Sequence, residues 1–227
     1  MANKEIVQEV GRPIGAQLGH VATPLHVAAI RDSIELEKLL DTGLDPNVTE
    51  SEFAQTPLHL SASHGLEKAV LCLLKAKANL ELKDSLGNTA LHYAVRNDHV
   101  RIVSLLLDHG ANVNSTNASR QTPLHMAAEK CRTACMSILL ENEADPNAKD
   151  GYGQTALHHS AYRGDESAIL LLRQRGANVF AKNDDGRGPT EYAKRGGNYA
   201  ILSLLSNEAQ MTPSAKFAAQ TSEQRQR

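Results

Sequence analysis

A seven-residue motif recurs along the chain at a constant interval, and this interval constrains the fold more than any other feature of the sequence. Its five complete copies read TPLHVAA, TPLHLSA, TALHYAV, TPLHMAA and TALHHSA, and they begin at Thr23, Thr56, Thr89, Thr122 and Thr155. Successive copies begin 33 residues apart, and a degenerate sixth copy, GPTEYAK, follows at Gly188. A period of this length is typical of a stack of similar units, in which each unit contacts only its neighbours.

Each position of the motif has a predicted role at the start of a helix. The threonine is an N-cap, because its hydroxyl can accept from a backbone N–H that has no partner inside the helix. Proline suits the first helical position, where it has no N–H to leave unpaired. The leucine is predicted to face inward, and the histidine to bond back to the cap. The predicted structural caps are Thr23, Thr56, Thr89, Thr122 and Thr155.

A second helix is predicted in each unit. Apolar residues at helical spacing mark it, as in the segment 102–107. It ends at a glycine in three units, Gly43, Gly110 and Gly176, where this residue can adopt the left-handed conformation that closes a helix. Lys77 and Glu143 stand at the equivalent position in two other units. Segments rich in Asn and Asp then lead to the next threonine and are predicted to be projecting turns.

These features together resemble the ankyrin repeat proteins. The TPLH motifs, the LL-x-x-G-A-N helix endings and the intervening loops extend over roughly residues 18–208. The resemblance implies an all-α repeat fold, an α-solenoid of paired antiparallel helices from which β-hairpin loops, here termed fingers, project at right angles. It also implies that the repeats bind other proteins and do not themselves catalyse a reaction.

Six repeats are expected, and the last is expected to cap the stack. Thr190 and Glu191 replace the inward leucine and the histidine in the sixth unit, which suits a repeat with one face in water. The predicted repeats are 18–50, 51–83, 84–116, 117–149, 150–182 and the capping unit 183–208. A partly ordered N-terminal segment, 1–17, is expected before them, and a polar, disordered tail, 209–227, after them.

Composition favours a cytoplasmic protein. The chain has no apolar run of membrane-spanning length, no secretory signal and three cysteines without the spacing of a disulfide framework. The nucleus, or a host cytosol for a secreted effector, is an alternative location. The formal net charge of −2 argues against a dedicated nucleic-acid binder. We therefore expect a monomer without a cofactor or a bound metal.

An enzyme is the main competing hypothesis. Cys131, Cys135 and His125 lie close together in the sequence and would be the residues of a thiol- or metal-dependent site. However, no oriented base or oxyanion site accompanies these cysteines, and Cys135 falls at a core position of the second helix. The repeated histidines occur once per unit, so they are too far apart to share one ion.

Two columns of residues that the scaffold does not dictate are candidates for partner binding. The position three before each threonine, near the finger tip, is apolar at Phe53, Leu86 and Tyr152. The end of the first helix is basic in every unit, and this column contains Arg31, His64, Arg96, Lys130, Arg163 and Arg195; all but Arg31 are predicted to bind the partner, with Tyr162 beside them. The tips could instead pack on neighbouring fingers, and the basic column could be a solvated face.

From these columns the sequence predicts a protein–protein interaction module. The partner would bind on the concave face formed by the finger tips and the first helices, and an acidic patch on it would match the basic column. A non-catalytic adaptor, scaffold or regulator is the expected role, with a host-targeting effector as an alternative use of the same scaffold.

Overall fold

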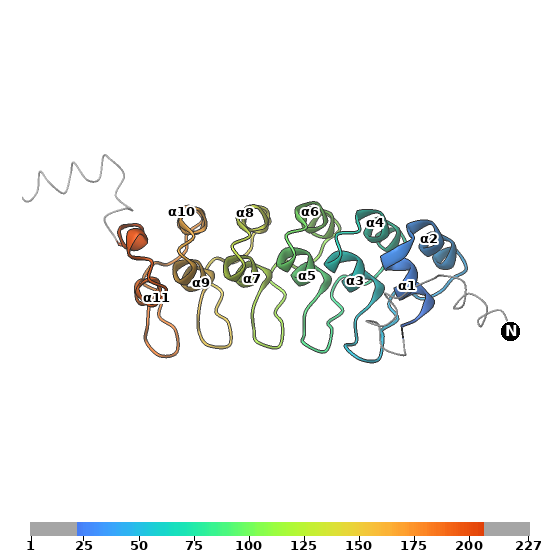
Figure 1. The fold of residues 1–227 in the computed structure, drawn as a ribbon, viewed down its shortest axis with the longest axis horizontal. Coiled ribbons are helices and arrows are strands. Elements are labelled where there is room, and N and C mark those ends of the chain that lie inside the picture. Colours follow the sequence, from blue (N-terminus) through green and yellow to red (C-terminus); the bar gives the residue numbers. More distant parts are fainter. Residues whose placement is uncertain (1–21, 207–227) are drawn as a thin grey trace, which may run out of the picture.

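The structure, a computed structural model, describes residues 22–206, which form six consecutive pairs of short helices (Figure 1). The first helices of the pairs are α1 (Pro24–Arg31), α3 (Pro57–Ser63), α5 (Ala90–Arg96), α7 (Pro123–Glu129), α9 (Ala156–Arg163) and α11 (Pro189–Arg195). The second helices are α2 (Ser33–Asp41), α4 (Glu67–Lys75), α6 (Val100–Asp108), α8 (Thr133–Glu141), α10 (Glu166–Gln174) and the 3-10 helix η1 (Tyr199–Leu205). The predicted segments 1–17 and 209–227 lie outside the described residues.

The helices form two parallel rows. Each first helix packs against the first helices of the adjacent pairs, and each second helix does the same in the outer row (Figure 1). The elongated stack that results is the all-helical solenoid that the 33-residue period predicts. Among residues 22–206, no helix combines the length and apolar character needed to cross a membrane.

Leucine and alanine fill the space between the two rows. The inward leucine of the motif, for example Leu58 or Leu124, is only 1% exposed, and the alanines that follow it are also buried. Small residues at these sites allow adjacent first helices to approach closely, while larger residues such as Met136 and Ile169 fill the core beside the second helices. Burial of this apolar surface is the main force that holds each repeat against its neighbours.

The threonine and histidine of each motif form the helix start that the sequence predicts. In the second repeat, the Thr56 N–H donates to Nδ1 of His59 over 3.1 Å, and Thr56 Oγ1 lies 2.8 Å from the same nitrogen. The other four complete motifs repeat both contacts. Because Nδ1 accepts the backbone N–H, the proton of the neutral ring is on Nε2.

That second ring nitrogen links each repeat to the next. Nε2 of His59 donates to the Asn88 carbonyl at 3.0 Å, and Nε2 of His125 donates to the Gln154 carbonyl at 3.0 Å. Equivalent bonds join the remaining three histidines to the following finger. One imidazole per repeat therefore caps its own helix and also fixes the position of the adjacent finger.

The second helices end where the sequence predicts. The backbone of Gly43, Gly110 and Gly176 has φ between +85° and +88°, in the left-handed region. Lys77 and Glu143 occupy the same position in their repeats and adopt φ of +58° and +65°. The first repeat also has the shorter connection between its helices, since only Asp32 separates α1 from α2.

The fingers differ from the predicted β-hairpins. No strand is present within residues 22–206, and the fingers are instead built from turns. A backbone bond closes each tip, such as Asp84 N–H to the Asn88 carbonyl at 3.0 Å. Other tip N–H groups donate to a polar side chain of the finger or to backbone carbonyls of the same or the adjacent tip, so no ladder of paired strands is needed to satisfy them.

Candidate protein-binding surface

The apolar residues of the tip column project from the molecule. Phe53, Leu86 and Tyr152 are 48%, 58% and 69% exposed, respectively. Their side chains are therefore not buried against neighbouring fingers, which was the alternative explanation for their apolar character. The equivalent residue of the fourth finger, Ser119, is also exposed, so the row has a polar gap at this point.

The backbones of adjacent tips are joined to one another. The Phe53 carbonyl accepts from the Ser85 N–H at 2.8 Å, and the Leu86 carbonyl accepts from the Ala118 N–H at 3.0 Å. The next two fingers continue the pattern, from Gly151 N–H to the Ser119 carbonyl and from Asp184 N–H to the Tyr152 carbonyl. These bonds hold the exposed side chains at fixed intervals along one edge of the stack.

A polar side chain inside each described finger, buried in all of them except the fourth, holds the tip in shape. Asp150 Oδ1 accepts from the N–H groups of Tyr152 and Gln154, both at 2.9 Å. Asp84 Oδ1 makes the same two contacts, with the N–H groups of Leu86 and Asn88. Asn117, Asn183 and Glu50 occupy the equivalent place in the other fingers.

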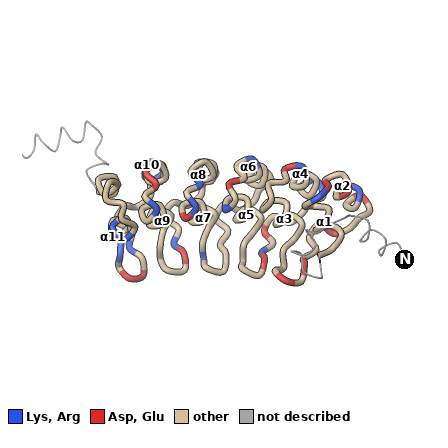
Figure 2. Tube along the Cα trace, in the orientation of Figure 1, with Lys and Arg blue, Asp and Glu red and all other residues tan. Residues whose placement is uncertain are grey.

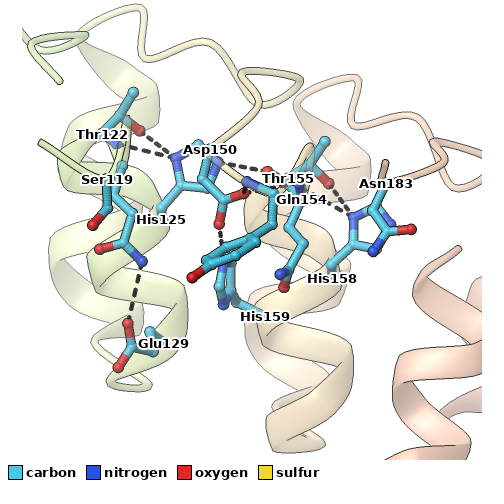
Figure 3. A network of polar contacts seen from close by, with 12 residues as sticks. Ser119, Thr122, His125, Glu129, Asp150, Gln154, Thr155, His158, His159 and Asn183 are labelled. Atoms are coloured by element: carbon cyan, nitrogen blue, oxygen red, sulfur yellow. Dashed lines mark hydrogen bonds and ion pairs between the residues drawn. The ribbon is translucent and has the colours of Figure 1, made fainter. Parts of the chain in front are cut away.

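The fifth position of the motif, which varies from repeat to repeat, supplies a ring that supports three of these fingers. The sequence analysis did not predict this role. The Tyr93 hydroxyl donates to Asp84 Oδ2 at 2.6 Å. Figure 3 shows the equivalent contact of the fifth repeat, in which His159 Nε2 lies 3.0 Å from Asp150 Oδ2. In the sixth repeat the Tyr192 hydroxyl accepts from Asn183 at 3.1 Å. Each ring and its partner are nine residues apart, and this spacing is the signal that could have revealed the contact.

The same rings pack edge-on against the capping histidine of the preceding repeat. The ring centroids of His59 and Tyr93 are 5.9 Å apart, as are those of His125 and His159, and both interplanar angles are 87°. His158 and Tyr192 form a third such pair at 5.2 Å. The support of a finger tip is thus continuous with the helix cap of its neighbour (Figure 3).

Burial and hydrogen bonding set the charge state of these groups. Burial alone would raise the pKa of Asp150, but the His159 ring and the two tip N–H groups hold this pKa below its usual value. Burial, together with the hydrogen bond to Asp84, raises the pKa of Tyr93 to about 12. Burial lowers the pKa of His125, and the nearby His159 lowers it further. At neutral pH, Asp150 is therefore charged while Tyr93 and His125 are neutral.

The basic column has two kinds of member. The side chains of Arg31, His64, Arg96 and Arg195 are exposed, and the Arg195 guanidinium lies 5.7 Å from the centre of the Tyr192 ring. Tyr162, beside the column, is 49% exposed. Lysines and arginines are interspersed with acidic residues along both helix rows (Figure 2).

The other two members of the column contact the same acidic residue. Lys130 Nζ lies 2.8 Å from Glu129 Oε1, and Arg163 Nε donates to the Glu129 carbonyl at 2.8 Å. Both cations therefore already have a hydrogen-bond acceptor within the stack. Two lysines of the fingers are also engaged, because Lys83 Nζ donates to the Thr116 carbonyl and Lys149 Nζ to the Lys182 carbonyl.

Cys131, Cys135 and His125, the residues of the competing enzyme hypothesis, lie in three different environments. Cys135 is buried in the core, where burial and the hydrogen bond from its thiol to Asp98 raise its pKa to about 12. Cys131 is exposed in the connection between α7 and α8. Both ring nitrogens of His125 are engaged in the cap and the next finger. Within residues 22–206, no group of three or more His, Cys, Asp or Glu side chains could hold a metal ion.

The fold and this surface define a stacked helical repeat with a row of projecting fingers. A model of the family described as ankyrin repeats (3 copies) matches residues 3–84, 25–117, 70–150 and 114–183 in overlapping segments. The chain belongs to the ankyrin repeat family. Ankyrin repeats are in general protein–protein interaction modules, and the family is typically non-catalytic.

Several characterised proteins share short segments with the chain. It is 45% identical over 53 residues to the potassium channel AKT2/3 of Arabidopsis thaliana, which is 23% of this chain and 6% of the channel. It is 38% identical over 66 residues to the human ankyrin repeat and SOCS box protein 16, covering 29% of this chain and 15% of that protein. The potassium channel SKOR of Arabidopsis thaliana is 42% identical over 62 residues, or 27% of the chain and 7% of the channel. The similarity therefore spans only a small part of each of these relatives.

Proposed function

We propose that this protein binds a partner protein along the face formed by its finger tips and first helices, and that it acts as a non-catalytic adaptor, scaffold or regulator. One observation carries the proposal. Phe53, Leu86 and Tyr152 expose apolar side chains on finger tips whose backbones are hydrogen-bonded to one another. An exposed apolar row of this kind is typical of a protein-binding surface.

The rigidity of the row favours binding. Association costs conformational entropy when loops must become ordered at the interface. The tips are already fixed by their inter-finger bonds and by Asp84 and Asp150, so this cost is reduced. Large side chains such as Tyr152 then offer contact area that a partner can desolvate, as aromatic residues do at binding hot spots.

An acidic patch on the partner would complement the basic column. The exposed side chains of Arg96, Arg163 and Arg195 carry positive charge at the ends of three first helices. Charges placed at the rim of an interface mainly accelerate association, since they steer the partner before contact is made. We propose that the tips provide the contact area and the basic column the attraction.

We further propose that the protein acts as a monomer in a reducing compartment, the cytoplasm being the first choice. Cys72, Cys131 and Cys135 are free thiols in the structure, which suits that environment. Use of the scaffold as a host-targeting effector would require the same binding surface, and the identity of the captured partner would separate the two roles.

Affinity capture followed by kinetics tests the proposal. The wild-type protein and a Phe53→Ala/Leu86→Ala/Tyr152→Ala variant would be used to capture partners, identified by mass spectrometry. For a partner retained by the wild type, the variant is expected to dissociate at least about 100-fold faster, because each of the three lost anchors costs about 1–2 kcal/mol. The matched control is Leu71→Ala/Leu170→Ala, which removes exposed leucines from the outer helices α4 and α10.

The two variants separate specific binding from a general loss of apolar surface. Equal dissociation rates for the tip variant and the wild type would show that the partner binds elsewhere. Circular dichroism should give the same unfolding midpoint for all three proteins within about 2 °C, because the exchanged side chains are exposed.

A further inference from the structure

The charged fingers of the third and fifth repeats share one arrangement but use different rings to support it. Asp84 and Asp150 each use Oδ1 for two tip N–H groups and direct Oδ2 to a ring nine residues later. That ring is a tyrosine in the third repeat and His159 in the fifth. The tyrosine stays neutral throughout the physiological range, whereas an imidazole changes its charge between pH 5 and 8.

The other fingers show why a ring accompanies these two aspartates. Glu50 uses both carboxylate oxygens for backbone N–H groups of its own finger, and its repeat has Leu60 at the ring position. Asn117, which is uncharged, is accompanied by Met126. A donor ring therefore occurs where a buried aspartate has a second oxygen that the backbone does not reach.

Titratable groups from the finger and from two helices face His159. Asp150, whose side chain is 2% exposed, faces it from the finger, and the Glu129 carboxylate interacts with it from α7. The two rings nearest to it, His125 from α7 and His158 from α9, are held neutral by burial, which lowers the pKa of both. Two carboxylates and two neutral rings thus surround the imidazole.

We propose that His159 is a positioning residue that acts through Asp150 on the Tyr152 finger tip, and that it makes the order of this tip depend on pH. The carboxylate of Asp150 is charged in either case, but when His159 carries its proton the contact is also an ion pair, and the attraction between opposite charges adds to the hydrogen bond. When the proton is lost, the neutral ring still donates but holds Asp150 less firmly. The tip is therefore better ordered at pH 5.5 than at pH 8.

This arrangement would regulate the binding surface, and in that respect the inference rests on the proposed function. Tyr152 is the most exposed of the three apolar tip residues, and Asp150 fixes its backbone N–H. A change in the order of this tip alters the entropy that a partner must remove on binding. Acidification toward pH 5.5 would strengthen the contribution of the fifth finger and leave that of the third unchanged.

NMR on the free protein tests the inference without any partner. The exchange of the Tyr152 and Gln154 amide protons, corrected for the intrinsic effect of pH, would be followed from pH 5.5 to 8 together with the His159 ring resonances. We expect protection of both amides to fall on the order of fivefold as the ring loses its proton. The Leu86 and Asn88 amides, held by Asp84, serve as the internal control and should keep constant protection.

Substitutions already present in other repeats provide the matched variants. His159→Tyr copies the third repeat and should keep the tip amides protected at every pH while abolishing the pH dependence. His159→Leu copies the second repeat and should lower the protection of both amides at every pH. Tyr93→His should transfer the pH dependence to the Leu86 and Asn88 amides.

Two results would overturn the inference. One is constant protection of the Tyr152 and Gln154 amides in the wild type while the His159 ring titrates. The other is a pH dependence that survives in His159→Tyr, which would assign the effect to another group. Either result would leave the proposed function standing, because partner capture by the tip row is measured separately.

Discussion

At the scale of single residues, two of the positions that end the second helices have a strained backbone conformation that a substitution by glycine would relieve. Lys77 and Glu143 adopt positive φ at a site where three other repeats have glycine. A side chain with a Cβ atom in this conformation costs about 1 kcal/mol relative to glycine. Lys77→Gly and Glu143→Gly should therefore each raise the thermal midpoint by about 2–4 °C in a protein of this size.

The reverse exchange provides the control for this prediction. A Cβ atom added at Gly110 would meet nothing within 4 Å, so Gly110→Ala introduces only the conformational cost. Its midpoint should fall by a similar amount, measured by circular dichroism. If Lys77→Gly and Glu143→Gly leave the midpoint unchanged or lower it, interactions of the two side chains outweigh the strain.

The cysteines should differ in reactivity as their surroundings differ. Cys135 is fully buried, its pKa is raised to about 12, and a thiolate is the reactive form of cysteine. Cys131 is exposed. A thiol reagent at pH 8 should label Cys131 within minutes and leave Cys135 unmodified until the protein is unfolded, as peptide mass spectrometry would show. Early labelling of Cys135 would contradict its placement in the core.

At the scale of the elements, the column of capping histidines makes the joints between repeats sensitive to acid. Burial lowers the pKa of all five rings, to about 4 for His92 and His158. Between pH 6.5 and 4 the unfolded chain binds protons that the folded chain excludes. Stability therefore falls as the pH decreases through this range, by up to about 1.4 kcal/mol per pH unit for each ring that stays neutral.

Denaturation in urea at several pH values would measure this dependence. His92→Gln should lower stability at pH 7, since it removes the bonds to Thr89 and Gln121, but it should also reduce the slope between pH 6.5 and 4. His109→Gln, at an exposed site at the end of α6, should leave the slope unchanged. An unaltered slope in His92→Gln would show that other groups cause the acid sensitivity.

The helix pairs could be predicted from the sequence because their signals are local. Thr56, Pro57 and His59 lie within one helical turn, and their roles follow from helix geometry alone. The contact of Asp150 with His159 does not follow from helix geometry, because it depends on how the turn folds the finger back onto its own helix; the nine-residue spacing shared by three repeats is the one sequence signal for it. The hydrogen bond from Arg163 to the Glu129 carbonyl could not be predicted from local geometry either, because Glu129 lies in the preceding repeat.

The fingers illustrate the limit of a family resemblance. The resemblance implies that the projecting segments form β-hairpins. Instead of paired strands, buried side chains such as Asp84 and Asp150 accept hydrogen bonds from tip N–H groups. Backbone bonds also close each tip, and further backbone bonds run between neighbouring tips. The fingers are therefore ordered by the stack as a whole, which a pattern within one repeat cannot show.

At the scale of the whole molecule, stacking converts one residue per repeat into a continuous surface. The apolar finger tips form one edge of the stack, and the basic residues at the ends of the first helices form a second row along it (Figure 1). Because the two lines act by different physical effects, they should influence different steps of binding. Under the proposed function, we expect the apolar tips to affect dissociation through desolvated contact and the basic column to affect association through long-range attraction.

Reversal of charge in the basic column tests this division. Arg96→Glu/Lys130→Glu/Arg163→Glu should slow association with the captured partner about tenfold or more at low salt, and the difference from the wild type should shrink as the Debye length falls toward 8 Å at physiological ionic strength. Lys68→Glu/Lys75→Glu/Arg101→Glu is the matched control, since it changes the net charge equally at exposed sites on the outer helices α4 and α6. Glu129 loses two cationic contacts in the column variant, so its fold would be verified by circular dichroism before association is measured. Equal association rates for the column variant and the control at low salt would show that only the net charge matters, and that the column does not steer the partner.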